Sequence, residues 1–181
     1  MPGVQERQSE FEAFYWQLLE KVAKRYKVPD LRPIRTAFSV FFTFGIMDGL
    51  LIKRLRAANL TIPGFNSLVL LAHGNPDGYP LSELSRFLVS SRANATGVVD
   101  SLVKKGFVER TDHPEDRRVI IAKITPKGRK WLDGYFPGHA RMMASFASAL
   151  SKEERTTVIR LLGKMRQGIV KNVAAMERAK P

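Results

Sequence analysis

Polar side chains that can bond to phosphates and to the edges of DNA bases gather in one short stretch of this chain. Hydroxyl, amide and guanidinium groups follow one another between residues 85 and 96. Amides and guanidiniums can bond base edges in pairs, so we expect Arg92 and Asn94 to read bases. Hydroxyls more often position a helix on phosphates. The full set of candidates is Arg86, Ser90, Ser91, Arg92, Asn94 and Thr96, with Ser85 expected on the same outer face.

A second group of charges lies further along, in Thr111-Asp-His-Pro-Glu-Asp-Arg-Arg118. This segment is too polar to pack in a core and predicts the tip of a β-hairpin. Its arginines Arg118 and, as second choice, Arg117 could enter a narrow, A·T-rich minor groove. We expect Asp116 to pair with an arginine of the tip and hold the turn without touching DNA. The plainer alternative is a hairpin that covers a helical core and whose charges are merely solvated.

The elements that must position these groups are two short helices and a hairpin. Apolar residues recur every three or four positions, which predicts helices over residues 81–88 and from 90–91 to 105. Gly106 is placed to end the second helix. Strands are expected at 107–110 and 119–124, which completes a winged helix. The expected inward residues are Leu81, Leu84, Phe87 and Leu88 in the first helix and Val98, Val99, Leu102 and Val103 in the second.

These segments resemble the winged-helix core of the MarR family of bacterial transcription regulators. SSRANATGVVDSLVKKGFVER is similar to the family's recognition helix and first wing strand, and DRRVIIAKITPKG fits its wing pattern. LTIPGFNSLVLLAHG, residues 60–74, resembles the preceding helix less closely. The resemblance is strong over residues 60–131 and positional only at both ends. The wing pattern is matched by Asp116, Arg118, Ala122, Ile124, Thr125 and Gly128.

The resemblance implies a mainly α fold with a small antiparallel β wing and a helical dimerisation region formed by both termini. The predicted divisions are an extension helix and linker over 1–33, a dimerisation helix over 34–59, the winged helix over 60–128 and dimerisation helices over 129–181. A urate-responsive subgroup also carries an added N-terminal helix with a tryptophan, to which Trp16 would correspond. Asn66 and Val98 depart from that subgroup's pattern, so urate is not expected.

Both ends of the chain predict long apolar helices. A helical face runs through residues 11–22, and residues 34–58 are apolar on most sides. Pro126 suits a first helical turn, Pro137-Gly138 should interrupt a helix before residues 142–150, and Ser151-Lys-Glu-Glu154 is a capping box. Such faces imply a two-fold dimer on a palindromic site with half-sites about 10 bp apart. The alternative is a monomeric bundle.

A small-molecule site is expected at a concave junction between the dimerisation helices and the DNA-binding lobe. The family resemblance implies aromatic carboxylates or phenols that release a repressor. Arg35 or Arg54 could meet a carboxylate. Plain core packing of these aromatics, or a constitutive repressor without ligand, are the alternatives. The candidate lining consists of Trp16, Arg35, Phe38, Phe41, Phe42, Met47, Arg54 and His73.

Composition limits the other possibilities. A formal net charge of +13 over 181 residues favours a polyanionic partner, although the excess is spread along the chain and also suits a solvated surface. The absence of cysteine excludes disulfides and thiol-based sensing. The three histidines show no metal-ligand spacing, and no cofactor or enzyme motif is present.

The sequence predicts a sequence-specific, homodimeric DNA-binding regulator in the cytoplasm, more in keeping with a repressor than an activator. A nucleoid-type architectural protein and a winged helix used for protein interaction are the alternatives. No signal peptide is recognised, and we expect no membrane partner. The most apolar stretch, Ala37–Ile52, is shorter than the roughly 20 residues of a bilayer span, and Asp48 interrupts it.

Overall fold

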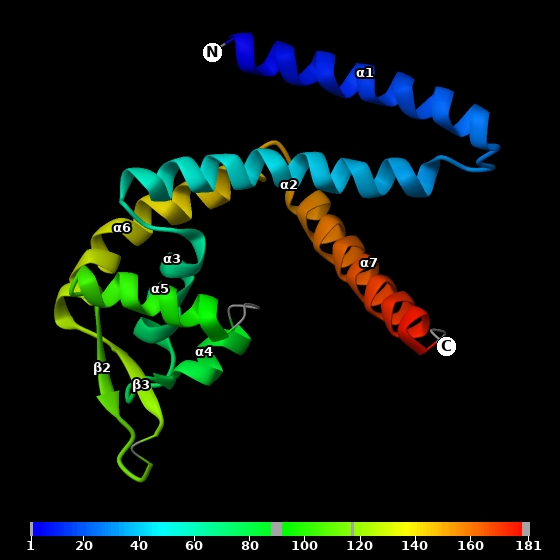
Figure 1. Cartoon of the computed structure of the whole chain (residues 1–181). Coiled ribbons are helices and arrows are strands. Elements are labelled where there is room, and N and C mark those ends of the chain that lie inside the picture. The colour runs from blue at the N-terminus through cyan, green and yellow to red at the C-terminus, as the bar shows by residue number, and fades with distance from the viewer. Residues whose placement is uncertain (1, 88–91, 117, 179–181) are drawn as a thin grey trace. The chain divides into compact units, whose positions relative to one another are not determined.

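The computed structural model describes residues 2–87, 92–116 and 118–178, with the backbone alone for residues 2–9 and 92–94. The chain divides into two compact units, residues 1–62 and residues 63–181. The finer division expected at residues 33, 59 and 128 stays a prediction. The elements in chain order (Figure 1) are α1 (Pro2–Tyr26), α2 (Arg32–Ala57), α3 (Ile62–His73), β1 (Tyr79–Pro80), α4 (Leu81–Phe87), α5 (Arg92–Lys104), β2 (Val108–Asp112), β3 (Ile120–Ile124), α6 (Pro126–Ser145) and α7 (Lys152–Arg178).

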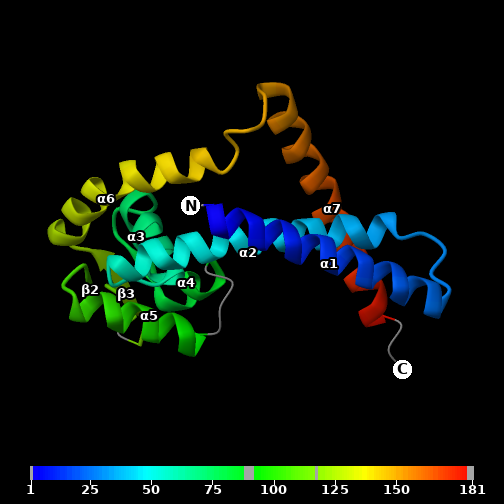
Figure 2. The ribbon, with the colours of Figure 1, turned by 90° about the horizontal axis from the view of Figure 1, so that it is seen from above.

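The first unit consists of α1 and α2, which run alongside each other in opposite directions (Figures 1 and 2). Aromatic rings join the two helices. The ring of Tyr15 lies 4.8 Å from that of Phe38 and 5.2 Å from that of Phe42, and the ring of Trp16 lies 5.7 Å from that of Phe42. Large rings bury much apolar area for few rotatable bonds, so a two-helix unit gains most of its packing here.

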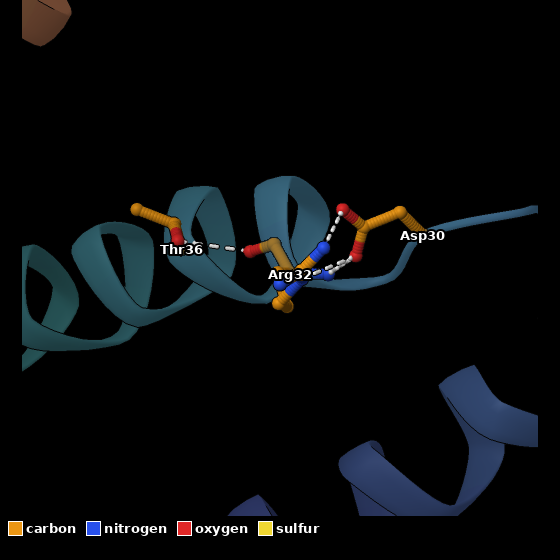
Figure 3. Close-up of polar contacts among 3 residues, drawn as sticks. All are labelled: Asp30, Arg32 and Thr36. Carbon is orange, nitrogen blue, oxygen red and sulfur yellow. Dashed lines mark hydrogen bonds and ion pairs between the residues drawn. The ribbon is translucent and has the colours of Figure 1, made fainter.

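The start of α2 is organised by Asp30 (Figure 3). Its two carboxylate oxygens accept hydrogen bonds from Nε and Nη2 of Arg32, each at 2.9 Å, and Oδ1 also accepts the backbone N–H of Arg32 at 2.9 Å. The Arg32 guanidinium, helped by that N–H, holds the pKa of the Asp30 carboxyl below its usual value. This contact therefore stabilises the turn at neutral pH and is lost as acid protonates Asp30.

Among the described residues, α2 is the one helix long and apolar enough to cross a membrane, with a mean hydropathy of 1.4 over its most apolar 18-residue window. The expectation that this segment was too short for a span was wrong, because the helix continues beyond both ends of the apolar stretch and has 26 residues in all. None of that window is buried inside the molecule. Length and composition alone are weak evidence for a span, because a soluble protein's apolar helix passes the same test.

The winged helix in the second unit closes as the sequence predicted. Gly106 adopts φ +70° and donates its N–H to the Val103 carbonyl oxygen at 2.8 Å. The next residue, Phe107, donates its N–H to the Leu102 carbonyl oxygen at 3.0 Å. These two bonds form the Schellman motif that ends helices at a glycine. The chain then enters β2 directly, so α5 and the wing are joined without a flexible linker.

The wing is a three-stranded antiparallel sheet of order β1-β3-β2. Arg110 of β2 lies opposite Ala122 of β3, and Tyr79 of β1 lies opposite Ala122 on its other side. The two-residue strand β1 was not predicted, because its pairing partner is some forty residues away. The fold class, mainly helical with a small antiparallel wing, is confirmed. The buried core of this unit includes Phe65, Leu68, Leu84, Ala95, Val99, Leu102, Val108, Ala122 and Leu132.

Several expectations about which residues face inward were wrong. Phe87 is 58% exposed and contacts the Tyr79 ring edge-on, and Val103 is also exposed. Ser85 is buried instead of facing outward, with its hydroxyl donating to the Ser82 carbonyl oxygen at 2.7 Å. Short helices carry only two turns of pattern, so one residue's rotation about the axis is enough to exchange inner and outer faces.

The C-terminal helices also differ from expectation in one respect. Helix α6 continues through Pro137 to Ser145, whereas an interruption at Pro137-Gly138 and a helix over 142–150 were expected. The capping box before α7 is confirmed, since the Ser151 N–H donates to Glu154 at 2.7 Å and the Glu154 N–H donates to Ser151 Oγ at 3.2 Å. No described residue of α7 is buried, which leaves its apolar side chains exposed.

The start of α6 is tied to the end of α5. Thr125 Oγ1 donates to the Gly106 carbonyl oxygen at 2.7 Å and accepts the Gly128 N–H at 3.0 Å, so one hydroxyl caps α6 and holds α5. Lys127 Nζ donates to the Lys105 oxygen at 2.8 Å, and Arg129 Nη1 to the Ala72 oxygen at 2.9 Å. Cations are favourable at helix C-termini, so the first turn of α6 stabilises the ends of α5 and α3.

Two glycines of α6 provide a matched test of this packing. A Cβ at Gly128 would lie 2.2 Å from the Phe107 carbonyl oxygen, whereas one at Gly134 meets nothing within 4 Å. Gly128→Ala should destabilise the protein by about 1–3 kcal/mol through overpacking. Gly134→Ala should stabilise it by about 0.5–1 kcal/mol, because alanine is the better helix former. Urea denaturation followed by circular dichroism measures both, and equal effects would contradict the close approach of α6 to Phe107.

Candidate nucleic-acid interface

The residues predicted to contact DNA lie on α4, α5 and the wing. Arg86 is exposed in the last turn of α4, and the backbone places Arg92, Asn94 and Thr96 in the first turns of α5. Arg118 is exposed at the wing tip. Ser90, Ser91 and Arg117 lie outside the described residues. The helix with the polar run and the charged hairpin tip thus belong to one compact unit.

Strand alternation gives the wing two faces of different character. Val108 and Arg110 share one face of β2, while Glu109 and Thr111 share the other. Val108 is buried in the core beside α5. Arg110 therefore points towards the same helix, and its guanidinium forms an ion pair with Asp100 of α5 at 2.7 Å. The same Nη2 lies 3.5 Å from the Thr96 carbonyl oxygen, one turn earlier in α5.

Arg110 is a candidate site residue that was not predicted from the sequence. Its side chain is 33% exposed and that of Asp100 is 44% exposed, so the pair lies at the surface beside the polar run of α5. The sequence did contain a signal for this pair. Asp100 is the one acidic residue of α5, and Arg110 is the one arginine of β2. Arg110 therefore links α5 to β2 at the surface.

The wing tip is a turn held by backbone contacts. Asp116 Oδ1 accepts the Arg118 backbone N–H at 3.0 Å, and the Asp116 carbonyl oxygen accepts the Val119 N–H at 2.9 Å. Glu115 N–H donates to His113 Nδ1 at 3.2 Å. The Asp116 carboxylate contacts the backbone of Arg118, and the expected pairing of Asp116 with an arginine side chain of the wing stays a prediction, because Arg117 lies outside the described residues. The carboxylate thereby holds the turn and leaves the Arg118 guanidinium exposed.

The outer face of the wing is acidic. A groove between the turn that precedes β1 and the wing is lined on the wing side by Glu109 and Thr111, whose partners across the sheet are Lys123 and Ile121. Carboxylates repel a phosphate backbone, so a polyanion would meet the opposite side, where Arg110 and α5 lie. The carboxylates that line this groove are Asp77, Glu83, Glu109, Asp112 and Glu115.

Five of the eight predicted ligand-site residues come together in the first unit. Trp16, Phe38 and Phe42 belong to one cluster of rings, with Phe41 exposed at its edge. The guanidinium carbon of Arg35 lies 5.7 Å from the Trp16 ring centre, and its Nη2 pairs with Glu20 at 2.5 Å. The Arg35 Nε is buried and has no hydrogen-bond partner among the described residues.

The remaining ligand-site candidates are not part of that cluster. Met47 and Arg54 are half-buried further along α2. His73 is exposed at the end of α3, in the second unit. A pocket formed by the whole predicted set stays a prediction.

The chain matches known regulators. The model of the MarR family matches residues 60–120. The HTH-type transcriptional regulator MhqR of Bacillus subtilis is 35% identical over 102 residues, which are 56% of this chain and 69% of the relative. The HTH-type transcriptional repressor YetL of the same organism is 27% identical over 141 residues, 78% of this chain and 84% of the relative.

Solved structures share the fold. Sco3205, a MarR family transcriptional regulator from Streptomyces coelicolor in complex with DNA, matches with a TM-score of 0.67 and 24% identity over 74% of this chain and 84% of that one. Bordetella bronchiseptica BpsR, whose DNA binding is regulated by 6-hydroxynicotinic acid, matches with a TM-score of 0.64 and 21% identity over 72% and 91% of the two chains.

The Asp100–Arg110 pair predicts a small effect on folding. Both side chains are partly exposed, so Arg110→Ala should lower the free energy of unfolding by only about 0.2–1 kcal/mol. Glu109→Ala is the matched control, because it removes a charge from the neighbouring residue on the opposite face and breaks no such pair. Urea denaturation of both variants measures the difference. A loss of about 3 kcal/mol or more in Arg110→Ala would instead indicate a desolvated, buried pair.

Proposed function

This chain belongs to the MarR family of winged-helix DNA-binding transcriptional regulators, a family of regulators and not of enzymes, and we propose that it acts as a homodimeric repressor. In this proposal each protomer places α5 in the major groove of one half of a palindromic site. The wing places Arg118 in the adjacent minor groove, and a small aromatic carboxylate or phenol releases the protein from DNA. The protein acts in the cytoplasm, with no membrane partner.

The observation that carries the DNA-binding proposal is the ion pair between Arg110 of the wing and Asp100 of α5. Because it joins the helix with the base-reading candidates to the strand that leads to Arg118, helix and wing approach DNA as one rigid element. Arg92 and Asn94 would bond base edges, while Arg86, Ser90, Ser91 and Thr96 would bond phosphates. The acidic outer face of the wing favours this orientation over the reverse.

Exposed apolar side chains support the dimer. Phe41, Phe44 and Leu50 of α2 are exposed, as are Ile159, Val170 and Met176 of α7. Exposed apolar side chains in number on one helix mark a surface that another protein covers, and α2 and α7 each carry such a set. A two-fold dimer covers the same patches on both copies, and it sets the half-sites about 10 bp apart.

The ring cluster supports an aromatic ligand. An aromatic carboxylate could stack on Trp16 and satisfy the buried Nε of Arg35, provided that Glu20 gives up its place on that guanidinium. The regulation of BpsR by 6-hydroxynicotinic acid is an example of this ligand class in a protein of the same fold. A flat ring that carries one carboxylate is the chemistry that this cluster fits.

A DNA-binding titration at physiological salt tests the proposed function. It compares the region upstream of the protein's own coding sequence with scrambled DNA of the same length, each with and without a panel of aromatic carboxylates and phenols. A preference of about 10³-fold or more for the upstream region supports a specific regulator. Equal and steeply salt-dependent binding to both would indicate an architectural protein, and no binding would favour a protein-interaction module.

Arg118 provides a direct test of the wing. Arg118→Ala should weaken binding to the specific site by about 1–3 kcal/mol, which is about 5- to 150-fold in Kd. Arg141→Ala, which removes an exposed arginine from α6, is the matched control for loss of net charge. Fluorescence anisotropy at one fixed salt concentration measures both. Unchanged affinity of Arg118→Ala would refute the placement of the wing in the minor groove.

A further inference from the structure

The extension helix α1 has a second apolar face that α2 leaves largely uncovered. Its side towards α2 carries Tyr15, Trp16 and the buried Ala23. A separate row of apolar side chains, which we call the outer stripe, is between 40% and 62% exposed, although its first ring also reaches that of Phe42. The spacing of three, four and four residues keeps the row on one side of the helix. The outer stripe consists of Phe11, Phe14, Leu18 and Val22.

The charges along α1 are separated into two halves. Residues 10–20 contain Glu10, Glu12 and Glu20 and no lysine or arginine, whereas residues 21–27 contain four cations and no carboxylate. Glu20 is engaged by Arg35 of the same chain, which leaves Glu10 and Glu12 in the acidic half. A helix of this kind repels a parallel copy of itself and attracts an antiparallel one.

We propose that the outer stripe of α1 is covered by the α1 helix of a second copy of this chain, packed antiparallel across the two-fold axis. This inference rests on the homodimer of the proposed function and assigns the extension a role in it. The charges of α1 favour a second copy of α1 as the helix that covers the outer stripe, because an antiparallel copy brings each acidic half against the basic half of its partner. Symmetry favours it as well, because a two-fold contact requires a self-complementary surface.

Charge also sets the register of the two helices. A crossing at Leu18 places Phe14 opposite Val22 of the partner subunit, and Glu10 beside Arg25 of the partner subunit. A crossing one turn earlier would leave Lys24 and Arg25 without a carboxylate opposite them. The two Leu18 side chains then meet on the axis, where helix packing brings residues on facing sides close together.

Because the chain contains no cysteine, single cysteines report this contact without interference. Leu18→Cys in the full-length protein should form an intermolecular disulfide on mild oxidation, because a disulfide requires Cα atoms about 4.4–6.8 Å apart. Ala13→Cys, which is exposed on the opposite side of α1, should form little or none. Non-reducing electrophoresis measures both. No disulfide in Leu18→Cys, or equal amounts in the two variants, overturns the proposal.

A second cross-linking experiment tests the same contact if Leu18→Cys disturbs the packing of α1. Separately tagged Phe14→Cys and Val22→Cys chains, mixed and oxidised, should give a mixed disulfide in excess of either homodimeric product. Homodimeric products in excess would overturn the register. The molecular mass and the DNA binding of the reduced variants are also measured, so that failure of the α1 contact can be distinguished from failure of the proposed dimer. A reduced dimer that binds DNA but does not cross-link contradicts the α1 contact alone, whereas a monomer contradicts both.

Charge reversal supplies an independent measurement. Glu10→Lys should raise the dimer dissociation constant by about 2- to 20-fold, since the two-fold axis repeats each surface pair twice. The double variant Glu10→Lys with Arg25→Glu should return it close to the wild-type value. Sedimentation at several concentrations measures the constant. If the double variant dimerises no more tightly than Glu10→Lys alone, antiparallel charge pairing is refuted.

Discussion

The winged helix depends on the hydroxyl of Thr125. This one group donates to the end of α5 and caps the start of α6, while the Thr125 backbone N–H donates to the Phe107 carbonyl oxygen at 3.0 Å. The recognition helix, the last strand of the wing and the helix that leaves the domain therefore meet at one residue. Gly128 allows α6 to approach the Phe107 backbone closely, and Gly106 supplies the positive φ at which α5 ends. The backbone positions of the recognition helix and the wing are fixed relative to that point.

The sequence predicted the features that local chemistry decides. Gly106 ends α5, Pro126 lies in the first turn of α6, and Ser151 with Glu154 begins α7, because each depends on residues at most five positions apart. Strand β1 and the Arg110–Asp100 pair were missed, because their partners are distant in sequence and no local pattern announces them. The effect of Pro137 was misjudged: α6 continues through it, and rings on both sides of it, Tyr135 and His139, contact Phe65. Phe87 was misplaced because two helical turns do not define a face.

The two units of the protein carry different surface properties. The first unit is joined by aromatic rings and is rich in exposed apolar surface, which suits contact with another protein copy and with an aromatic ligand. The second unit combines a polar recognition helix with a wing whose tip presents the exposed Arg118 and whose groove is lined by carboxylates. The exposed apolar surface and the uneven charge of the wing together favour a dimer that binds a symmetric site over a monomer that binds DNA without sequence preference. A protein attracted to DNA by its positive charge alone would not need an acidic face.

In the proposed dimer, two helix–wing elements read half-sites related by a two-fold axis, so its affinity should depend sharply on the distance between those half-sites. The decisive measurement uses the protein's binding site upstream of its own coding sequence, located by footprinting. The affinity of the protein for this site is measured after the spacing between the two half-sites has been changed. An insertion of about 5 bp turns the half-sites to opposite faces of the duplex. For a two-fold reader, this insertion lowers affinity to the level of a single half-site, while an equal number of base changes in the flanks has no such effect. Undiminished affinity after the insertion would contradict a two-fold reader.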